Sequence, residues 1–168
     1  MAEEYFDIVN ENDEIIGKAS RSDLYTKDLI HRSVIIFIFN KKGELLLQKR
    51  SKFKDLWKSR WTGSASGHVA LGESYEAAAK RELKEELGIK ISLKQSLFIK
   101  IRQKVNSRNI KLFIGESNGP FTFNKKEVDK IRFLSLAKIK KEIKKRKKFT
   151  PTFVVVLKAY LENLKKKN

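Results

Sequence analysis

The chain contains no cysteine and only two histidines in 168 residues. Without cysteine it has no disulfide framework, no thiolate nucleophile and no cysteine-based zinc site. Long apolar runs are missing too, and the longest, Val34 to Phe39, is far too short to span a bilayer. The first residues, MAEEYFDIVNENDE, are acidic and lack the basic-then-apolar order of a secretory signal. We therefore expect a soluble, cytoplasmic protein with no membrane partner.

Acidic residues are scarce, because 20 Asp and Glu stand against 38 Lys and Arg, which gives a formal net charge of +18. Such an excess attracts phosphate groups on nucleotides, nucleic acids or anionic membranes. Lysine and isoleucine are both abundant, however, and an AT-rich genome also produces that bias. We favour the compositional explanation, so the charge alone identifies no partner.

Hydrophobic residues make up 40% of the chain, which is enough for a folded core. Apolar alternation and turn residues predict a mixed α/β fold, and no linker or repeat divides it, so we expect one domain over residues 1–168. Within it, 1–30 is expected to be an N-terminal β-hairpin extension and 137–168 to hold C-terminal helices. The expected strands are 5–9, 14–18, 33–39, 44–50, 61–69, 95–105, 109–116 and 131–134, and the expected helices are 74–87, 137–147 and 150–163.

The clearest predicted helix, 74–87, carries an acidic face. Ser74 is placed to cap it and Gly88 to end it in a left-handed conformation. With Glu82 set at zero on a helical wheel, Glu85 lies at about −60° and Glu86 at about +40°. Carboxylates so close repel one another unless a cation neutralises them. Clustered carboxylate oxygens suit Mg²⁺ or Mn²⁺.

An alternative interpretation is a solvated acidic face with ion pairs to Lys80, Arg81 and Lys84. The flanking residues favour the metal site instead. Gly67 and Gly72 bracket a tight loop that enters the helix, and free backbone groups in such a loop can face a metal or a phosphate.

The stretch GHVALGESYEAAAKRELKEELGI resembles the signature of the Nudix hydrolases, G-x5-E-x7-R-E-U-x-E-E-x-G-U, where U is a bulky aliphatic residue. Every fixed position matches, namely Gly67, Glu73, Arg81, Glu82, Leu83, Glu85, Glu86, Gly88 and Ile89. The resemblance implies an α/β/α sandwich around a mixed β-sheet, with the motif as loop-helix-loop. It also implies a metal-dependent pyrophosphohydrolase that cleaves a diphosphate bond in a nucleoside diphosphate linked to some group X, or in a nucleoside triphosphate.

Carried over by position, the resemblance assigns the metal, Mg²⁺ or alternatively Mn²⁺, to the Gly67 carbonyl and to Glu82, Glu85 and Glu86. The resemblance also assigns a catalytic set, which consists of Glu73, Arg81, Glu82 and Glu85. Within this set, Arg81 and Glu73 are the supporting pair. Glu85 is our first choice for the general base, because an outer ligand can share its oxygens between metal and water. The distal alternatives are Glu116 and Glu127.

The expected substrate is a phosphorylated small molecule, most simply a nucleotide. Lys49 and Arg50 end a predicted strand near the motif and are plausible phosphate contacts. His68 lies in the motif loop, where a ligand or substrate role is one of two interpretations. Trp61, like Trp57, could stack on a base, although packing is the simpler role.

The segments HRSVIIFIFNKKGELLLQKR and WTGSASGHVALGES also resemble isopentenyl diphosphate isomerase, a non-hydrolytic branch of the same fold. His31 and His68 match that branch's histidines, although we favour a structural role for His31. Ser66 stands where the isomerase needs a cysteine, and Ser107 and Asn109 stand where carboxylates are expected. A serine hydroxyl is a poor acid or base near neutral pH. The sequence therefore predicts an isomerase-like hydrolase, with isomerase activity as the alternative.

A second alternative comes from the basic segment KIKKEIKKRKKF, which would suit an RNA-binding protein or an RNA 5′-end pyrophosphohydrolase. Its basic residues occupy nearly all helix faces, and no aromatic residues interleave with them. We therefore favour a solvated helix and treat RNA as the less favoured partner. The identity of X and the oligomeric state stay open at this stage.

Overall fold

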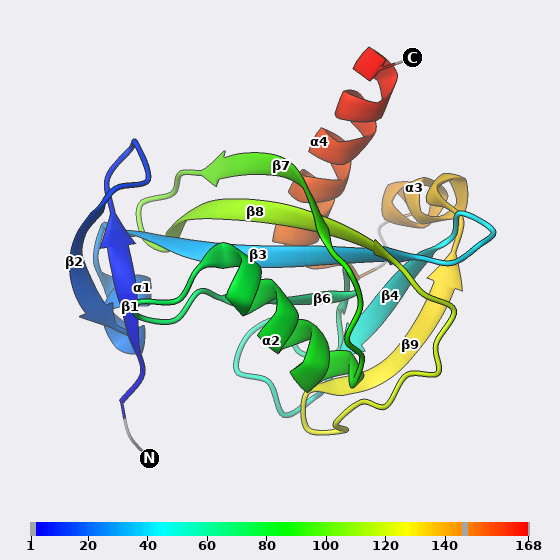
Figure 1. Ribbon diagram of the computed structural model, residues 1–168, viewed down its shortest axis with the longest axis horizontal. Helices are drawn as coiled ribbons and strands as arrows, with labels where there is room; N and C mark the ends of the chain where they lie inside the picture. Colours follow the sequence, from blue (N-terminus) through cyan, green and yellow to red (C-terminus); the bar gives the residue numbers. More distant parts are fainter. Residues whose placement is uncertain (1–2, 146–147, 168) are drawn as a thin grey trace.

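The computed structural model describes residues 3–145 and 148–167, and it shows one nine-stranded sheet with helices on both faces (Figure 1). The strands are β1 (Tyr5–Val9), β2 (Ile15–Ser20), β3 (Ile30–Phe39), β4 (Leu45–Arg50), β5 (Trp61–Thr62), β6 (Ala65–His68), β7 (Lys94–Ile101), β8 (Ser107–Glu116) and β9 (Val128–Leu134). The helices are α1 (Arg21–Thr26), α2 (Tyr75–Leu87), α3 (Leu136–Lys144) and α4 (Pro151–Lys167).

The long strand β3 organises the sheet. It runs parallel to β8 over its whole length and antiparallel to β1, β4 and β6. The register places His31 beside Arg108, and it places Ser33 beside His68. Successive side chains of a strand point to opposite faces, so β3 supplies both sides of the core.

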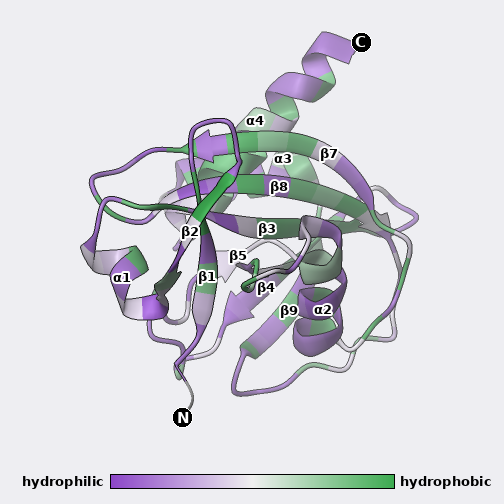
Figure 2. Ribbon diagram, turned by 60° about the vertical axis from the view of Figure 1, so that its left-hand side comes forward, coloured by the Kyte–Doolittle hydropathy of each residue, from purple (hydrophilic) through white to green (hydrophobic). Residues whose placement is uncertain are grey.

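Two apolar layers flank the sheet. On one face, Val34 and Ile36 of β3 pack with Ala79 and Leu83 of α2. On the other face, Phe37 and further residues pack with the C-terminal helices, and the partners there include Ile139, Phe153, Val156 and Leu157. In Figure 2 the long central strands carry hydrophobic residues, and the helices are hydrophilic on their outer sides. The expected α/β/α sandwich around a mixed sheet is confirmed.

The predicted N-terminal hairpin forms as β1 and β2, and it joins the sheet through Ile8 beside His31. The short helix α1 behind it was not predicted. It has only six residues, too few for a helical period to show in the sequence, and Ser20 caps it by accepting a hydrogen bond from the Asp23 N–H.

Several predicted strand boundaries are wrong, among them the start of β3 at Ile30 instead of Ser33 and of β9 at Val128 instead of Ile131. Strand β7 ends at Ile101 instead of Val105, and β8 begins at Ser107 instead of Asn109. The hydroxyl of Ser107 accepts from the Gln103 N–H and donates to its carbonyl, so the turn closes earlier than its polar residues suggested. The predicted strand 61–69 is likewise divided into β5 and β6.

The C-terminal helices differ in length from the prediction. Helix α3 ends at Lys144, and residues 146–147 of the predicted basic helix lie outside the described residues. Helix α4 continues to Lys167, beyond the predicted end at Asn163. Within the described residues, neither these helices nor any other is both long and apolar enough to cross a membrane.

Candidate active site

Helix α2 and the loop before it are fixed by local backbone chemistry. The Ser74 hydroxyl accepts from the Ala77 N–H at 3.1 Å and so caps the helix. Gly88 ends it with φ of 68°, and its N–H donates to the Lys84 carbonyl at 3.0 Å. A Cβ on Gly88 would lie 2.4 Å from the Thr122 carbonyl oxygen, so glycine is required there. The predicted helix and both of its end signals are confirmed.

Gly67 brings the β6 backbone directly against the helix. A Cβ built on Gly67 would lie only 1.9 Å from Oε1 of Glu82, so no other residue fits while that carboxylate keeps its place. The loop and helix thus place the Gly67 backbone and the Glu82 side chain together, as the motif implied.

Glu86 is the most buried of the motif carboxylates, with 4% of its surface exposed. One of its oxygens accepts from Nε2 of Gln48 at 2.6 Å and from the Ser66 N–H at 3.0 Å. Burial raises the pKa of Glu86 to about 7, although these two donors act in the opposite direction. Burial and then the neighbouring Glu86 charge raise the pKa of Glu82 to about 8, against the effect of Arg81.

Arg81 joins the carboxylates into one network. It donates to both oxygens of Glu73 at 2.9 Å, to Glu82 at 2.7 Å and to Glu85 at 3.3 Å. A further donation, at 3.0 Å, goes to the carbonyl oxygen of His68 in the loop. Burial by itself would raise the pKa of Glu73, but the hydrogen bonds from Arg81 and the Ala70 N–H, together with the Arg81 charge, lower that pKa. The arginine therefore offsets the mutual repulsion of the acidic face.

The described residues contain no group of three or more carboxylate or histidine side chains already arranged around a metal. Arg81 donates to Glu82 and Glu85, and Gln48 donates to Glu86. The donor set still fits a hard divalent cation, because carboxylate oxygens and a glycine backbone meet with no room for a Cβ.

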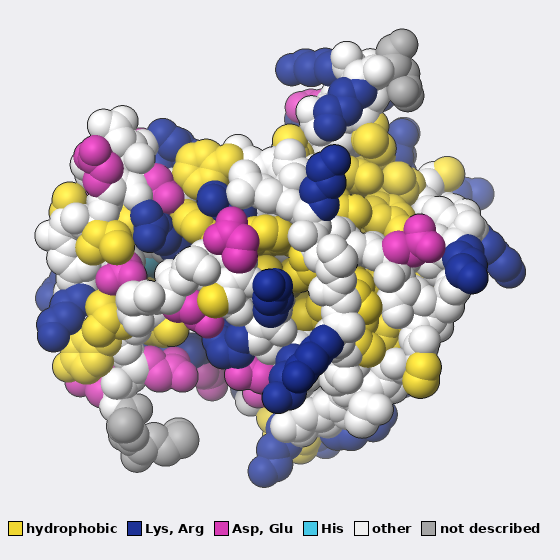
Figure 3. Space-filling view, in the orientation of Figure 1, with side chains coloured by type: hydrophobic (Ala, Val, Ile, Leu, Met, Phe, Trp, Pro, Cys, Tyr) yellow, Lys and Arg dark blue, Asp and Glu magenta, His cyan; other side chains and the backbone are white. Residues whose placement is uncertain are grey.

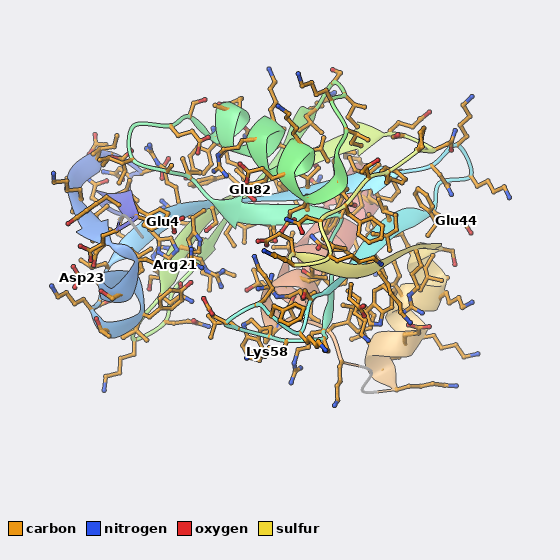
Figure 4. The ribbon with its side chains drawn as sticks, turned by 90° about the horizontal axis from the view of Figure 1, so that it is seen from below. Glu4, Arg21, Asp23, Glu44, Lys58 and Glu82 are labelled. Atoms are coloured by element: carbon orange, nitrogen blue, oxygen red, sulfur yellow. The ribbon has the colours of Figure 1, made fainter. Side chains whose placement is uncertain are left out.

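A positively charged region adjoins the acidic one. Side chains alternate along β6, so Ser66 and His68 point away from the face on which Ala65 packs. Burial lowers the pKa of His68 to about 3, and four cations lower it further. These are Arg21, Arg108, Lys54 and Arg50. Figure 4 shows Glu82 between α2 and the sheet, with Arg21 on the α1 side and Lys58 on the loop between β4 and β5.

Arg50, which the sequence analysis proposed as a phosphate contact, lies near both regions. Its Nε donates to the Leu56 carbonyl at 3.1 Å, and its charge acts on the pKa of both Glu86 and His68. Lys54 acts on the same two groups, although the sequence analysis did not single it out. Its position in a polar loop gave no signal, because nothing in that loop has a regular period.

Two predicted substrate contacts lie elsewhere. The Lys49 side chain points to the opposite face of the sheet from those of Gln48 and Arg50. It forms an ion pair with Asp129 at 3.4 Å. Trp61 packs against the cluster under α4, and the Arg132 guanidinium lies 4.0 Å from its ring centroid. In the described chain neither residue contacts the motif carboxylates, so packing accounts better for Trp61.

The two distal candidates for the general base also differ in position. Glu116 pairs with Phe39 at the far end of β3, five residues beyond Val34, which pairs with Gly67. Five strand residues span roughly 16 Å, so Glu116 lies far from the motif loop. Glu127 forms an ion pair with Lys54 and is the nearer of the two.

The family model of the NUDIX domain matches residues 29–153. The chain belongs to the Nudix family. Isopentenyl-diphosphate Delta-isomerase 2 of Photorhabdus laumondii is 36% identical to this Nudix protein over 140 residues, which cover 79% of this chain and 78% of that one. An uncharacterized Nudix hydrolase of Listeria monocytogenes is 44% identical over 91 residues, 54% of each chain. A crystal structure from Deinococcus radiodurans has a TM-score of 0.81 at 25% identity and covers 93% of this chain and 98% of that one.

These findings confirm the predicted family and its fold. They also support the predicted enzyme class, a Nudix-type hydrolase that acts on phosphorus anhydrides. The roles of the individual site residues come from the resemblance to the Nudix signature together with their chemistry, and they stay predictions.

Proposed function

We propose that this Nudix protein is a divalent-metal-dependent pyrophosphohydrolase that cleaves a nucleoside diphosphate linked to X, or a nucleoside triphosphate. The observation that carries the proposal is the contact of the Glu82 carboxylate with the Gly67 backbone, beside the buried Glu86. The Gly67 carbonyl and the carboxylates of Glu82, Glu85 and Glu86 would hold Mg²⁺ or Mn²⁺. A bound cation of this kind screens phosphate charge and lowers the pKa of water.

The roles of the chain's own residues follow from their contacts. Glu85 is the most exposed of the three, at 56% of its side chain, so it can take a proton from an attacking water. Arg81 orients that carboxylate and keeps the acidic face together when no cation is bound. Arg50 and Lys54 balance the charge of the substrate phosphates from the other side.

The test is a phosphate-release screen with and without Mg²⁺. The panel contains nucleoside triphosphates, nucleotide sugars, ADP-ribose, dinucleoside polyphosphates and capped RNA. We expect cleavage of at least one substrate, and we expect EDTA to abolish it. Metal-independent cleavage, or none over the whole panel, would contradict the proposal.

The isomerase is the second candidate, supported by the similarity to the Photorhabdus laumondii protein. Two observations weigh against it. Ser66 cannot act as the acid or base of that reaction near neutral pH. Ser107 bonds with the Gln103 backbone, and Asn109 donates to Asp13 at 2.8 Å, so both are occupied by structural contacts. Neither wild type nor Ser66→Cys should convert isopentenyl diphosphate with Mg²⁺ present, and clear turnover by the wild type would promote this candidate.

RNA is the less favoured substrate. In Figure 3, Lys and Arg side chains are spread over the visible face instead of gathering in one stripe. A single-strand binding groove would need an ordered positive track with stacking platforms. Weak binding to single-stranded RNA that disappears with rising salt would agree with this view.

A further inference from the structure

Arg108 has unusual surroundings for a charged residue. Its Nε is buried and has no hydrogen-bond partner within residues 3–145 and 148–167. One Nη donates to the Thr152 hydroxyl at 2.7 Å, which is a neutral partner. Burial lowers the pKa of Arg108, and only the Tyr25 phenol acts the other way. A partly buried guanidinium without a carboxylate is costly, because its desolvation is not offset by a counter-charge.

The residues around Arg108 add hydrogen-bonding groups and no negative charge. Arg108 lies beside His31 in the sheet, and the His31 and His68 rings are 5.0 Å apart. His31 is fully buried, and neither ring nitrogen makes a hydrogen bond of good geometry to a described residue. The Tyr25 hydroxyl lies 3.5 Å from Nε2 of His68. Arg108, His31, His68 and Tyr25, here called the Arg108 cluster, thus combine a cation with several neutral donors.

Each of the other cations near His68 interacts with a carboxylate of the described residues, and for Arg50 these carboxylates are Glu86 and Glu127. Arg21 pairs with Glu4 at 2.8 Å, and Lys54 pairs with Glu127. Among the described residues no carboxylate pairs with Arg108, and no Asp or Glu affects its pKa. The charge of the Arg108 cluster would therefore be balanced by an anion from outside the chain.

The Arg108 cluster lies close to the catalytic motif along strand β6. The Ser66 N–H contacts Glu86, and His68 follows two residues later along β6. Two strand residues span roughly 7 Å. A group bound at the cluster is therefore separate from a diphosphate held at the α2 carboxylates, yet one small molecule can reach both.

We propose that the Arg108 cluster is a subsite for a second phosphate group of the substrate, remote from the diphosphate that is cleaved. This inference rests on the proposed function for its substrate. A guanidinium binds carboxylate and phosphate alike, but the additional imidazole and phenol donors around Arg108 suit a phosphate, which has more acceptor oxygens than a carboxylate. Group X, or the nucleoside, then carries a phosphate of its own.

The test measures binding of inorganic phosphate by isothermal titration calorimetry in EDTA, at constant ionic strength set with chloride. Wild type should bind phosphate at one site, and Arg108→Met should weaken binding at least tenfold. Arg108→Lys keeps the charge and should lose less. The control Lys138→Met removes one exposed cation from α3 and should bind like wild type. Equal binding by Arg108→Met and wild type, with melting curves that show both folded, would overturn the inference.

A second arm separates this inference from the proposed function. Glu85→Gln should bind phosphate like wild type in EDTA, whatever its activity. With a phosphate-bearing substrate from the screen, Arg108→Met should raise KM at least tenfold while kcat stays within threefold. With a substrate that lacks the extra phosphate, KM should not change. Should KM rise equally for both substrates, the subsite would be refuted, while metal-dependent hydrolysis would be unaffected.

Discussion

The acidic network of α2 and the Arg108 cluster differ in how their charges are compensated. Arg81 contacts three glutamates and a backbone carbonyl, so part of the negative charge of the motif is balanced within the chain. Arg108 has only a hydroxyl as its described partner and lies beside neutral histidines. The difference indicates that the acidic network of α2 is stable without a bound cation. The positive charge of the Arg108 cluster, in contrast, is balanced only when an anion binds.

The largest loss of activity and stability is expected at Gly67, where the β6 backbone lies against the Glu82 carboxylate. Gly67→Ala places a Cβ on the Glu82 carboxylate, so either the loop or the helix must shift. We expect activity to fall about 100-fold, or about 2.7 kcal/mol in barrier, and the free energy of unfolding to fall by about 2 kcal/mol. Gly17→Ala is the control, since its Cβ meets nothing within 4 Å. Equal behaviour of the two variants in urea unfolding would contradict the contact.

Removal of the central arginine tests the acidic network itself. Arg81→Met leaves Glu73 and Glu82 without their shared partner, and about 2 kcal/mol of stability should be lost, after allowance for partial exposure. Lys80→Met removes the same charge from an exposed neighbouring position and should change stability by less than about 0.5 kcal/mol. Urea unfolding of both variants at one pH measures the difference.

The raised pKa values of Glu82 and Glu86, about 8 and about 7, predict how stability depends on pH. The folded state binds protons more tightly than the unfolded state, so these groups stabilise the fold at low pH. That stability should be lost progressively as pH rises from about 4.5 to about 8. Mg²⁺ should raise the melting temperature at pH 8 by binding the ionised carboxylates.

Thermal melting at pH 5, 6, 7 and 8 checks this sign, with Glu86→Gln as the comparison. That variant should lose part of the pH dependence and melt higher at pH 8 without metal. A wild-type melting temperature that rises over this range would indicate fully paired carboxylates and weaken the metal assignment.

The smallest effect is expected at the Arg108 cluster. Because Arg108 has no described counter-charge, Arg108→Met should not destabilise the ligand-free protein, and a gain of about 1 kcal/mol is expected. The sign is opposite to that for Arg81→Met, and urea unfolding without phosphate measures it. A loss as large as that of Arg81→Met would show that Arg108 is a structural residue.

The motif was predictable from sequence because its information is local. Ser74 caps the helix and Gly88 ends it, as expected, and the glutamates lie on that same helix. The resemblance to the Nudix signature also placed the Gly67 backbone beside the carboxylates. The resemblance did not predict the hydrogen-bond partner of Glu86. That partner, Gln48, lies 38 residues earlier in the sequence, and only the pairing of strands in the sheet brings it near.

The Arg108 cluster was not predictable for the same reason. Strand boundaries near residue 107 were misplaced, so the side chain beside His31 could not be named before the β3–β8 register was known. The error arose because the turn closes through Ser107 and Gln103, a side-chain contact that leaves no periodic signal. The N-terminal hairpin gave a clearer signal, since its turn residues and short extended runs are adjacent in sequence.

The most direct test of the central claim is the Mg²⁺-dependent turnover of Glu85→Gln on the best substrate from the screen. The account predicts a loss of at least about 100-fold, or roughly 3 kcal/mol in barrier, in a variant that melts like wild type. Glu76→Gln, an exposed change on the same helix, should keep full activity. Undiminished turnover by Glu85→Gln would contradict the account and move the general base toward Glu127.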